Sequence, residues 1–192
     1  MINLKPFLLS VLNDVSEKPV DEITTGAINA KRSKNLIEQL SEDFRKIYTS
    51  NDSVRVFSKD HYDNRAEFGM NELLHDILVC TTGLSSAARH KKKLRYITSA
   101  IWQVESELKN DTHAALIDFN KLVLGSATNK LFIGPLFTYK EKVLQTLLPA
   151  ALAAQRNGAN VHIAFVTHPK DWSKKPLEVH AWALDIDKWI EL

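Results

Sequence analysis

Three carboxylates stand within or at the end of apolar stretches, where an isolated charge is costly. Glu105 and Glu107 end the stretch 98–104, and Asp76 lies inside the stretch 73–80. Side chains two positions apart on a strand point to the same face, about 7 Å apart. Carboxylates gathered in an apolar setting repel one another, and a divalent cation with oxygen ligands removes that repulsion. A metal-dependent reaction is therefore the first hypothesis.

The periodicity of apolar side chains predicts the elements that position these residues. Helical spacing predicts four helices, over residues 3–14, 33–49, 112–124 and 141–156. Strand patterns predict six strands, over residues 54–57, 73–79, 96–107, 130–133, 161–167 and 177–185. Gly125 stands at the expected C-cap of the third helix, and residues 82–93 are expected to form a loop. This order predicts an α/β fold with a central mixed sheet flanked by helices.

The chain length predicts a single domain over residues 1–192. A chain of 192 residues is long enough for one hydrophobic core and too short for two large ones. Within it we expect a helical extension at 1–32, the core at 33–167, and a C-terminal strand and tail at 168–192. The sequence has no internal repeat and no linker rich in proline or glycine.

Composition is that of an ordinary globular protein, with 44% hydrophobic and 25% charged residues. The net charge of +2 does not by itself indicate a nucleic-acid binder. Two basic clusters are either solvated surface or phosphate contacts. The first comprises Lys31, Arg32 and Lys34, and the second comprises Arg89, His90, Lys91, Lys92, Lys93 and Arg95.

Cysteine usage and hydropathy favour a cytoplasmic location. The single cysteine, Cys80, cannot form an intramolecular disulfide, and its apolar neighbours predict a buried filler. No apolar run approaches the roughly 18 residues of a membrane span, and the N-terminus lacks the pattern of a signal peptide.

The placement of the acidic residues resembles the PD-(D/E)XK, or restriction-endonuclease-like, nuclease superfamily. The matching segments are Leu-His-Asp-Ile-Leu at 74–78 and Val-Glu-Ser-Glu at 104–107, followed by a helix, a strand and a helix. With Asp-Phe-Asn-Lys-Leu at 118–122, the chain is similar to a group of uncharacterised bacterial proteins assigned to this fold. The resemblance covers roughly residues 33–167.

This resemblance implies a nuclease that hydrolyses phosphodiester bonds with Mg²⁺ or Mn²⁺. Asp76 and Glu105 would be the metal ligands. The lysine of the motif is here replaced by Glu107, which would be a further ligand or orient the attacking water. Lys121, on the following helix, would supply the missing positive charge.

Several alternatives stay open at the level of sequence. Glu105 and Glu107 could face solvent at a strand end, Asp76 could lie exposed on an edge strand, and Lys121 could simply pair with Asp118. The chain would then be a non-catalytic relative that serves as a nucleic-acid-binding or protein-assembly module, or an unrelated α/β protein. The expected partner is nucleic acid, DNA in the first instance, with no membrane contact. A homodimer through the tryptophan-bearing segment 182–189 is a further expectation.

Overall fold

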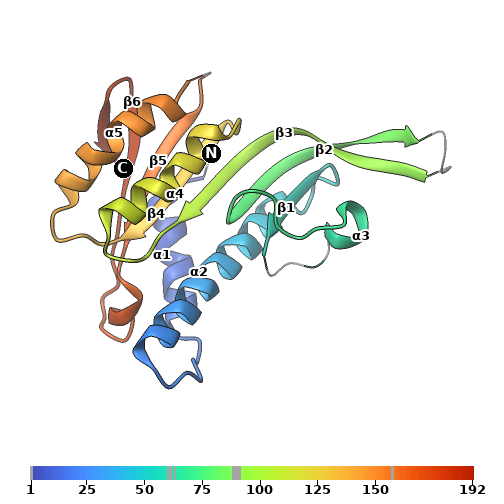
Figure 1. Ribbon diagram of the computed structural model, residues 1–192. Coiled ribbons are helices and arrows are strands. Elements are labelled where there is room, and N and C mark those ends of the chain that lie inside the picture. Colours follow the sequence, from blue (N-terminus) through green and yellow to red (C-terminus); the bar gives the residue numbers. More distant parts are fainter. Residues whose placement is uncertain (1, 60–61, 63, 88–91, 157) are drawn as a thin grey trace.

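The computed structural model describes residues 2–59, 62, 64–87, 92–156 and 158–192 (Figure 1). Its elements, in chain order, are α1 (Leu4–Ser16), α2 (Thr25–Tyr48), β1 (Val54–Ser58), α3 (Asn64–Phe68), β2 (Ile77–Ala87), β3 (Lys92–Ser106), α4 (Thr112–Leu124), β4 (Asn129–Pro135), α5 (Lys140–Ala154), β5 (Asn160–Val166), the 3₁₀ turn η1 (Pro169–Asp171), β6 (Val179–Asp185) and β7 (Lys188–Glu191).

The strands form one mixed sheet in sequence order, β1 to β7. The pairs β3–β4 and β4–β5 are parallel, and the other neighbouring pairs are antiparallel. The two parallel pairs are joined through α4 and α5, because a parallel connection needs a crossover element. The predicted α/β class, with a mixed sheet flanked by helices, is confirmed.

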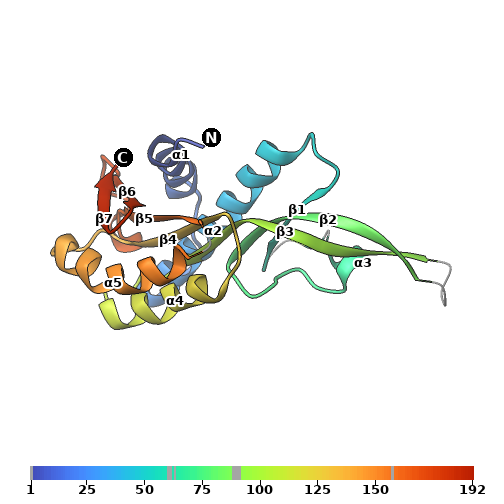
Figure 2. The same ribbon diagram turned by 90° about the horizontal axis from the view of Figure 1, so that it is seen from above.

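Helices cover the sheet on both faces, with α1 and α4–α5 on opposite sides (Figure 2). Alternation along β3 divides its side chains between the two layers. Trp102 and Val104 belong to the core under α1 and α2. Gln103 and Glu105 point to the other side, where Glu105 meets Lys121 of α4. An acidic side chain is thereby placed inside a helix–sheet layer.

Several element boundaries differ from the sequence prediction. The strand expected over 73–79 begins only at Ile77, so Asp76 stands directly before β2. The short elements α3 and β7 were not expected. The second helix begins at Thr25, not near residue 33, because the Thr24 side chain caps it by accepting a hydrogen bond from the Ala27 N–H. The loop expected over 82–93 was wrong within the described residues. There β2 and β3 continue as a paired ribbon as far as Ala87 and Lys92. The residues Arg89, His90 and Lys91 of the second basic cluster lie outside the described part of the chain.

The tryptophans expected at a dimer interface lie largely inside this chain. Trp182 is buried among residues of α4 and α5, and Trp189 donates its ring N–H to the Leu144 carbonyl. The expectation of a homodimer stays a prediction. In the described part of the chain, no helix has the length and apolar character that a bilayer crossing requires.

The first basic cluster is engaged in the fold. Arg32 donates to the Pro169 carbonyl and lies over the Trp172 ring, and Lys34 forms an ion pair with Glu38. The Arg32 contacts join α2 to the turn after β5, and the Lys34–Glu38 pair lies within α2 itself.

Candidate functional site

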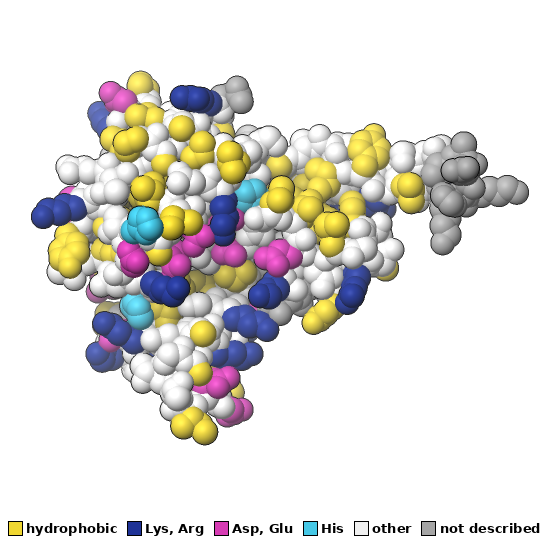
Figure 3. Space-filling view, viewed as in Figure 1, with side chains coloured by type: hydrophobic (Ala, Val, Ile, Leu, Met, Phe, Trp, Pro, Cys, Tyr) yellow, Lys and Arg dark blue, Asp and Glu magenta, His cyan; other side chains and the backbone are white. Residues whose placement is uncertain are grey.

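Asp76 and Glu105 meet where the β2–β3 ladder ends. Ile77, the first residue of β2, pairs with Val104 in antiparallel register, so Asp76 stands directly before β2 where Glu105 follows Val104 on β3. The charge of Asp76 raises the pKa of Glu105, which places the two carboxylates within interaction range. The site lies at the same edge as the C-terminal ends of β3 and β4. Figure 3 shows acidic side chains gathered there, with lysine and arginine side chains on the α2 side.

Glu105 is the most deeply buried acidic group of the site, with only 1% of its surface exposed. Oε1 lies 2.9 Å from His75 Nδ1, and Oε2 accepts a hydrogen bond of 3.1 Å from Lys121 Nζ. Burial raises the pKa of Glu105, and the charge of Asp76 adds to that rise, whereas His75 and Lys121 oppose it. The net effect is a raised pKa for Glu105, whose carboxyl group is held in place by His75 and Lys121.

A chain of hydrogen bonds fixes the proton position on His75. The Ala127 N–H donates to Gln103 Oε1, so the amide NH₂ of Gln103 faces His75 Nε2 at 2.9 Å. Nε2 must then be the acceptor, and the ring proton sits on Nδ1, from which it is donated to Glu105. The loop after α4 therefore orients the histidine that orients the glutamate.

Asp76 is held by Ser106, the last residue of β3. Its Oδ2 accepts hydrogen bonds from the Ser106 N–H, at 2.9 Å, and from the Ser106 hydroxyl, at 2.7 Å. Among the residues that the structure describes, none donates to Oδ1. One oxygen of Asp76 is therefore fixed by the protein, and the other is available to an added ligand.

Lys121 brings the positive charge of the site from α4. Its ammonium contacts Glu105 at 3.1 Å and Asp118 at 2.7 Å. Burial lowers the pKa of Lys121, but the hydrogen bonds and charges of Asp118 and Glu105 outweigh it and leave the pKa raised. Nearly half of the side chain is exposed, so this cation faces both the buried glutamate and solvent.

Glu107 lies apart from this group. Glu107 follows the last residue of β3, and its N–H still donates to the Ile133 carbonyl of β4. Its Oε1 accepts a hydrogen bond from the Lys109 N–H. Glu107 instead lines a cavity of about 500 Å³ between the β3 end, α2 and the turn at His168 and Pro169. Ser106 borders the same cavity, which therefore adjoins the residue that holds Asp76.

A buried lysine secures the loop that orients His75. Lys130 is 2% exposed and donates to the carbonyls of Gly125 and Ala154, at the C-terminal ends of α4 and α5. Burial lowers its pKa. A cation at helix C-termini satisfies carbonyls that lack intrahelical partners. Lys130 is thus a structural cation that fixes residues 125–127 beside the site.

Gly125 is the predicted C-cap, but its glycine is required for a different reason. Its φ of −86° is open to any residue. A Cβ there would overlap the Gln103 amide. That amide is buried and bonded to both Ala127 and His75, so it cannot move aside without breaking one of those bonds.

We expect Gly125→Ala to lower stability by about 1–3 kcal/mol, as overpacking in a buried site does. This corresponds to roughly 2–4 °C of melting temperature per kcal/mol for a chain of this size. Gly26→Ala is the matched control, because a Cβ there meets no atom within 4 Å and alanine favours a helix. Equal melting temperatures for the two variants, measured by calorimetry, would contradict the role given to Gly125.

The donor set fits a hard divalent cation with few protein ligands. Mg²⁺ keeps several waters and is usually bound through one or two carboxylates, which Asp76 and Glu105 provide. A carboxylate has about four lone-pair sites, so Glu105 retains acceptor capacity beyond its two partners. Among the described residues, no group of three or more His, Cys, Asp or Glu side chains is placed to hold a metal. The pair, not a larger cluster, is the candidate metal site.

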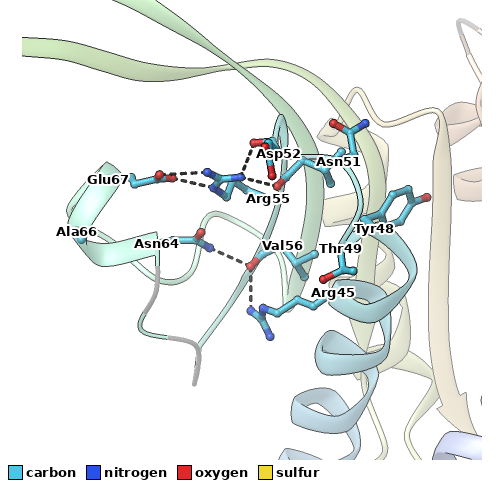
Figure 4. A pocket seen from close by; sticks show the side chains of 11 residues that line it. Arg45, Tyr48, Thr49, Asn51, Asp52, Arg55, Val56, Asn64, Ala66 and Glu67 are labelled. Carbon is cyan, nitrogen blue, oxygen red and sulfur yellow. Dashed lines mark hydrogen bonds and ion pairs between the residues drawn. The ribbon is translucent and has the colours of Figure 1, made fainter.

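A second hollow of about 500 Å³ lies between the end of α2, β1 and α3 (Figure 4). Its polar groups largely serve the fold. Arg55 makes two hydrogen bonds to Glu67, and the Val56 carbonyl accepts from Arg45 and Asn64. Glu67 also pairs with Arg95 of β3 at 3.2 Å. The contacts that line this hollow hold β1 and α3 against the edge of the sheet, and the hollow is not part of the acidic site.

Sequence reasoning identified Asp76, Glu105 and Lys121 but not the residues that position them. His75 is 4% exposed and bonded to Glu105. The sequence could have indicated Gln103, because a residue two positions before Glu105 on a strand points to the same face of the sheet. Comparison with known protein families, curated proteins and solved structures found no match.

Proposed function

We propose that this protein is a metal-dependent nuclease that hydrolyses phosphodiester bonds of DNA, with Asp76, Glu105 and Lys121 at its active site. The observation that supports this most is Glu105: a carboxylate 1% exposed, beside a second acid and in contact with a half-exposed lysine. Buried groups with shifted pKa values and specific charge partners concentrate at functional sites.

Asp76 and Glu105 would hold Mg²⁺ or Mn²⁺. When bound, such a cation lowers the pKa of a coordinated water and neutralises charge on the phosphate. Lys121 stabilises the negative charge that grows on the phosphate oxygens as water adds to phosphorus and the bond to the sugar oxygen breaks. His75 and Ser106 position the two carboxylates.

A second candidate function is a non-catalytic module that binds nucleic acid or assembles with another protein. It is favoured by one observation: both oxygens of Glu105 already have partners within the chain. Glu107, which stands where the motif has its lysine, is also turned away. The nuclease should both bind a cation and cleave DNA in its presence, whereas the non-catalytic module should not cleave DNA in any metal.

We expect Mg²⁺ or Mn²⁺ to raise the melting temperature of the wild type. A cation that binds only the folded state adds about 2.7 kcal/mol at a hundred times its dissociation constant. For this chain length the gain is roughly 5–10 °C. Asp76→Asn should abolish most of it, because the substitution removes a negatively charged ligand. Calorimetric scans in EDTA and in metal measure both.

Glu107→Gln is the matched control, since its carboxylate caps the Lys109 N–H and should leave the metal response intact. The function itself is tested by incubating the wild type with supercoiled plasmid in Mg²⁺, in Mn²⁺ and in EDTA. Metal-dependent nicking supports the nuclease. Metal stabilisation without any cleavage supports the non-catalytic module. The absence of both metal stabilisation and cleavage would contradict a role of the Asp76–Glu105 pair in metal binding as well as in catalysis.

A further inference from the structure

Leu74 combines two properties that are unfavourable for a leucine in a folded protein. Its backbone φ is 66°, in the left-handed region, where a Cβ is crowded and a bulky residue is a rare exception. Its side chain is 84% exposed, so it gains little from burial. Gly69, a left-handed residue shortly before it, is a glycine, which this backbone conformation favours. Neither the backbone nor the core therefore explains a leucine at position 74.

The turn around Leu74 is held from both sides. The His75 N–H donates to the Leu73 carbonyl at 2.8 Å, which closes a three-residue turn with Leu74 at its centre. A three-residue turn whose central φ is positive is rare and strained. Leu73 packs against a small hydrophobic core formed by β1 and β2, and His75 is buried and bonded to Glu105. Because both neighbours are fixed, the strain persists and Leu74 is held facing solvent.

Leu74 also stands beside the candidate active site. His75 and Asp76 follow it directly in the chain. Consecutive Cα atoms are 3.8 Å apart, so the Cα atoms of Leu74 and Asp76 are separated by no more than about 7.6 Å. Successive phosphates of one DNA strand advance by roughly 3.4 Å along the helix axis. The exposed leucine is therefore within reach of the bases next to a phosphate bound at the Asp76–Glu105 pair.

We propose that Leu74 inserts between two stacked bases of the DNA substrate, next to the phosphate that is cut. The inference rests on the proposed function and adds how that substrate is held. Leucine is among the apolar residues that proteins insert between base steps, where the side chain partly unstacks the bases and kinks the duplex. The fixed turn limits the conformational entropy that is lost when the side chain is ordered. Insertion covers the exposed apolar surface of Leu74 and turns the adjoining phosphate toward Asp76.

Three variants separate insertion from a structural role. Leu74→Gly removes the side chain and suits the left-handed backbone, so its melting temperature should equal or exceed that of the wild type. Leu74→Met keeps a long apolar side chain in the same backbone. Ile186→Gly is the matched control, because Ile186 also has a positive φ, of 57°, and is 79% exposed. Its turn joins β6 to β7 beside the start of β5, at the sheet edge opposite the acidic pair.

The test uses a short DNA duplex that carries 2-aminopurine, a base whose fluorescence rises when it is unstacked. Binding in EDTA, followed by anisotropy to saturation, should raise the fluorescence with the wild type, Leu74→Met and Ile186→Gly, but not with Leu74→Gly. Single-turnover cleavage in Mg²⁺ at saturating protein is the second readout. Leu74→Gly should cleave about tenfold or more slowly, because the phosphate is no longer turned toward the site, whereas the other two variants should stay within a few-fold of the wild type.

A fluorescence rise that persists in Leu74→Gly would overturn the inference, as would equal losses of cleavage in Leu74→Gly and Ile186→Gly. Unchanged fluorescence with a fall from dimer to monomer mass in Leu74→Gly would overturn it in favour of a contact between protein chains. Metal-dependent cleavage with no fluorescence change in the wild type would remove insertion alone and leave the nuclease proposal. A fluorescence rise that depends on Leu74, without cleavage, would leave the inference standing and remove the nuclease proposal. A wild type that binds no DNA would overturn both.

Discussion

Glu105→Gln should lower metal-dependent DNA cleavage by at least about a thousandfold while making the folded protein more stable at neutral pH. The loss of activity follows from removing one of two charged ligands, a change of several kcal/mol in transition-state stabilisation. The gain in stability follows from replacing a buried carboxylate, whose pKa is raised mainly by burial, with a neutral group of the same shape. The His75 proton can still be accepted by the Gln amide oxygen.

The stability effect has a defined dependence on pH. The pKa of Glu105 is raised in the folded protein above its ordinary value of 4.5, so the folded state binds this proton more tightly than the unfolded state. The contribution is therefore fully present below pH 4.5 and is lost as pH rises through the folded pKa. The advantage of the glutamine variant should be smallest in acid, grow through this window, and then level off.

Chemical denaturation in EDTA at a series of pH values measures this difference, and plasmid nicking in Mg²⁺ measures the activity. Glu107→Gln provides the control for both, since Glu107 lies outside the carboxylate pair. A glutamine variant that cleaves DNA normally would rule out Glu105 as a ligand. A variant less stable than wild type at every pH would show that the His75 and Lys121 contacts outweigh the cost of burial.

Lys121→Ala should lower cleavage by about a hundredfold and leave the metal-induced rise in melting temperature largely intact. An ammonium group is not a ligand for Mg²⁺, but it stabilises charge on the reacting phosphate, and removal of one such donor costs on the order of a hundredfold to a thousandfold. Cleavage under single-turnover conditions, together with melting scans in metal, separates these two effects.

Asp118→Asn tests the simpler role of Lys121 as half of a surface ion pair. This substitution removes the 2.7 Å partner of Lys121 but retains its contact with Glu105. If Lys121 acts on the phosphate, Asp118→Asn should change cleavage by no more than a few-fold. Equal losses in the two variants would assign Lys121 to the ion pair alone.

Most of the longer elements and the closeness of the main acidic pair could be predicted from the sequence, because both depend on local patterns, whereas the short elements α3 and β7 could not. Period-two and helical spacing determine which segments form strands and helices, and α4 has the predicted bounds, residues 112–124. The positions of Asp76 and Glu105 follow from adjacent strands in antiparallel register. Such register is determined by burial, which is visible in the apolar runs.

What escaped prediction depends on contacts between distant segments. The bond between His75 and Glu105 spans thirty residues, and that between Gln103 and Ala127 spans twenty-four. Glu107 was expected on the same face as Glu105, but its carboxylate accepts from the Lys109 N–H and lines the cavity beside α2. The outer part of the β2–β3 pair was predicted as a loop because residues 82–93 contain Gly83, two serines and the basic cluster. Its strands are held by each other and need no core.

The arrangement of the site along the gene has a consequence for how it is inherited. The side chains and backbone groups that hold Asp76 and Glu105, from His75 to the loop secured by Lys130, come from one uninterrupted stretch of chain, residues 75–130. The strands β2 and β3 lie inside that stretch as well. A genetic exchange with breakpoints outside these codons therefore transfers the acidic pair and its orienting groups together. The recipient must still supply the carbonyl at the end of α5 that Lys130 binds, that of Ala154.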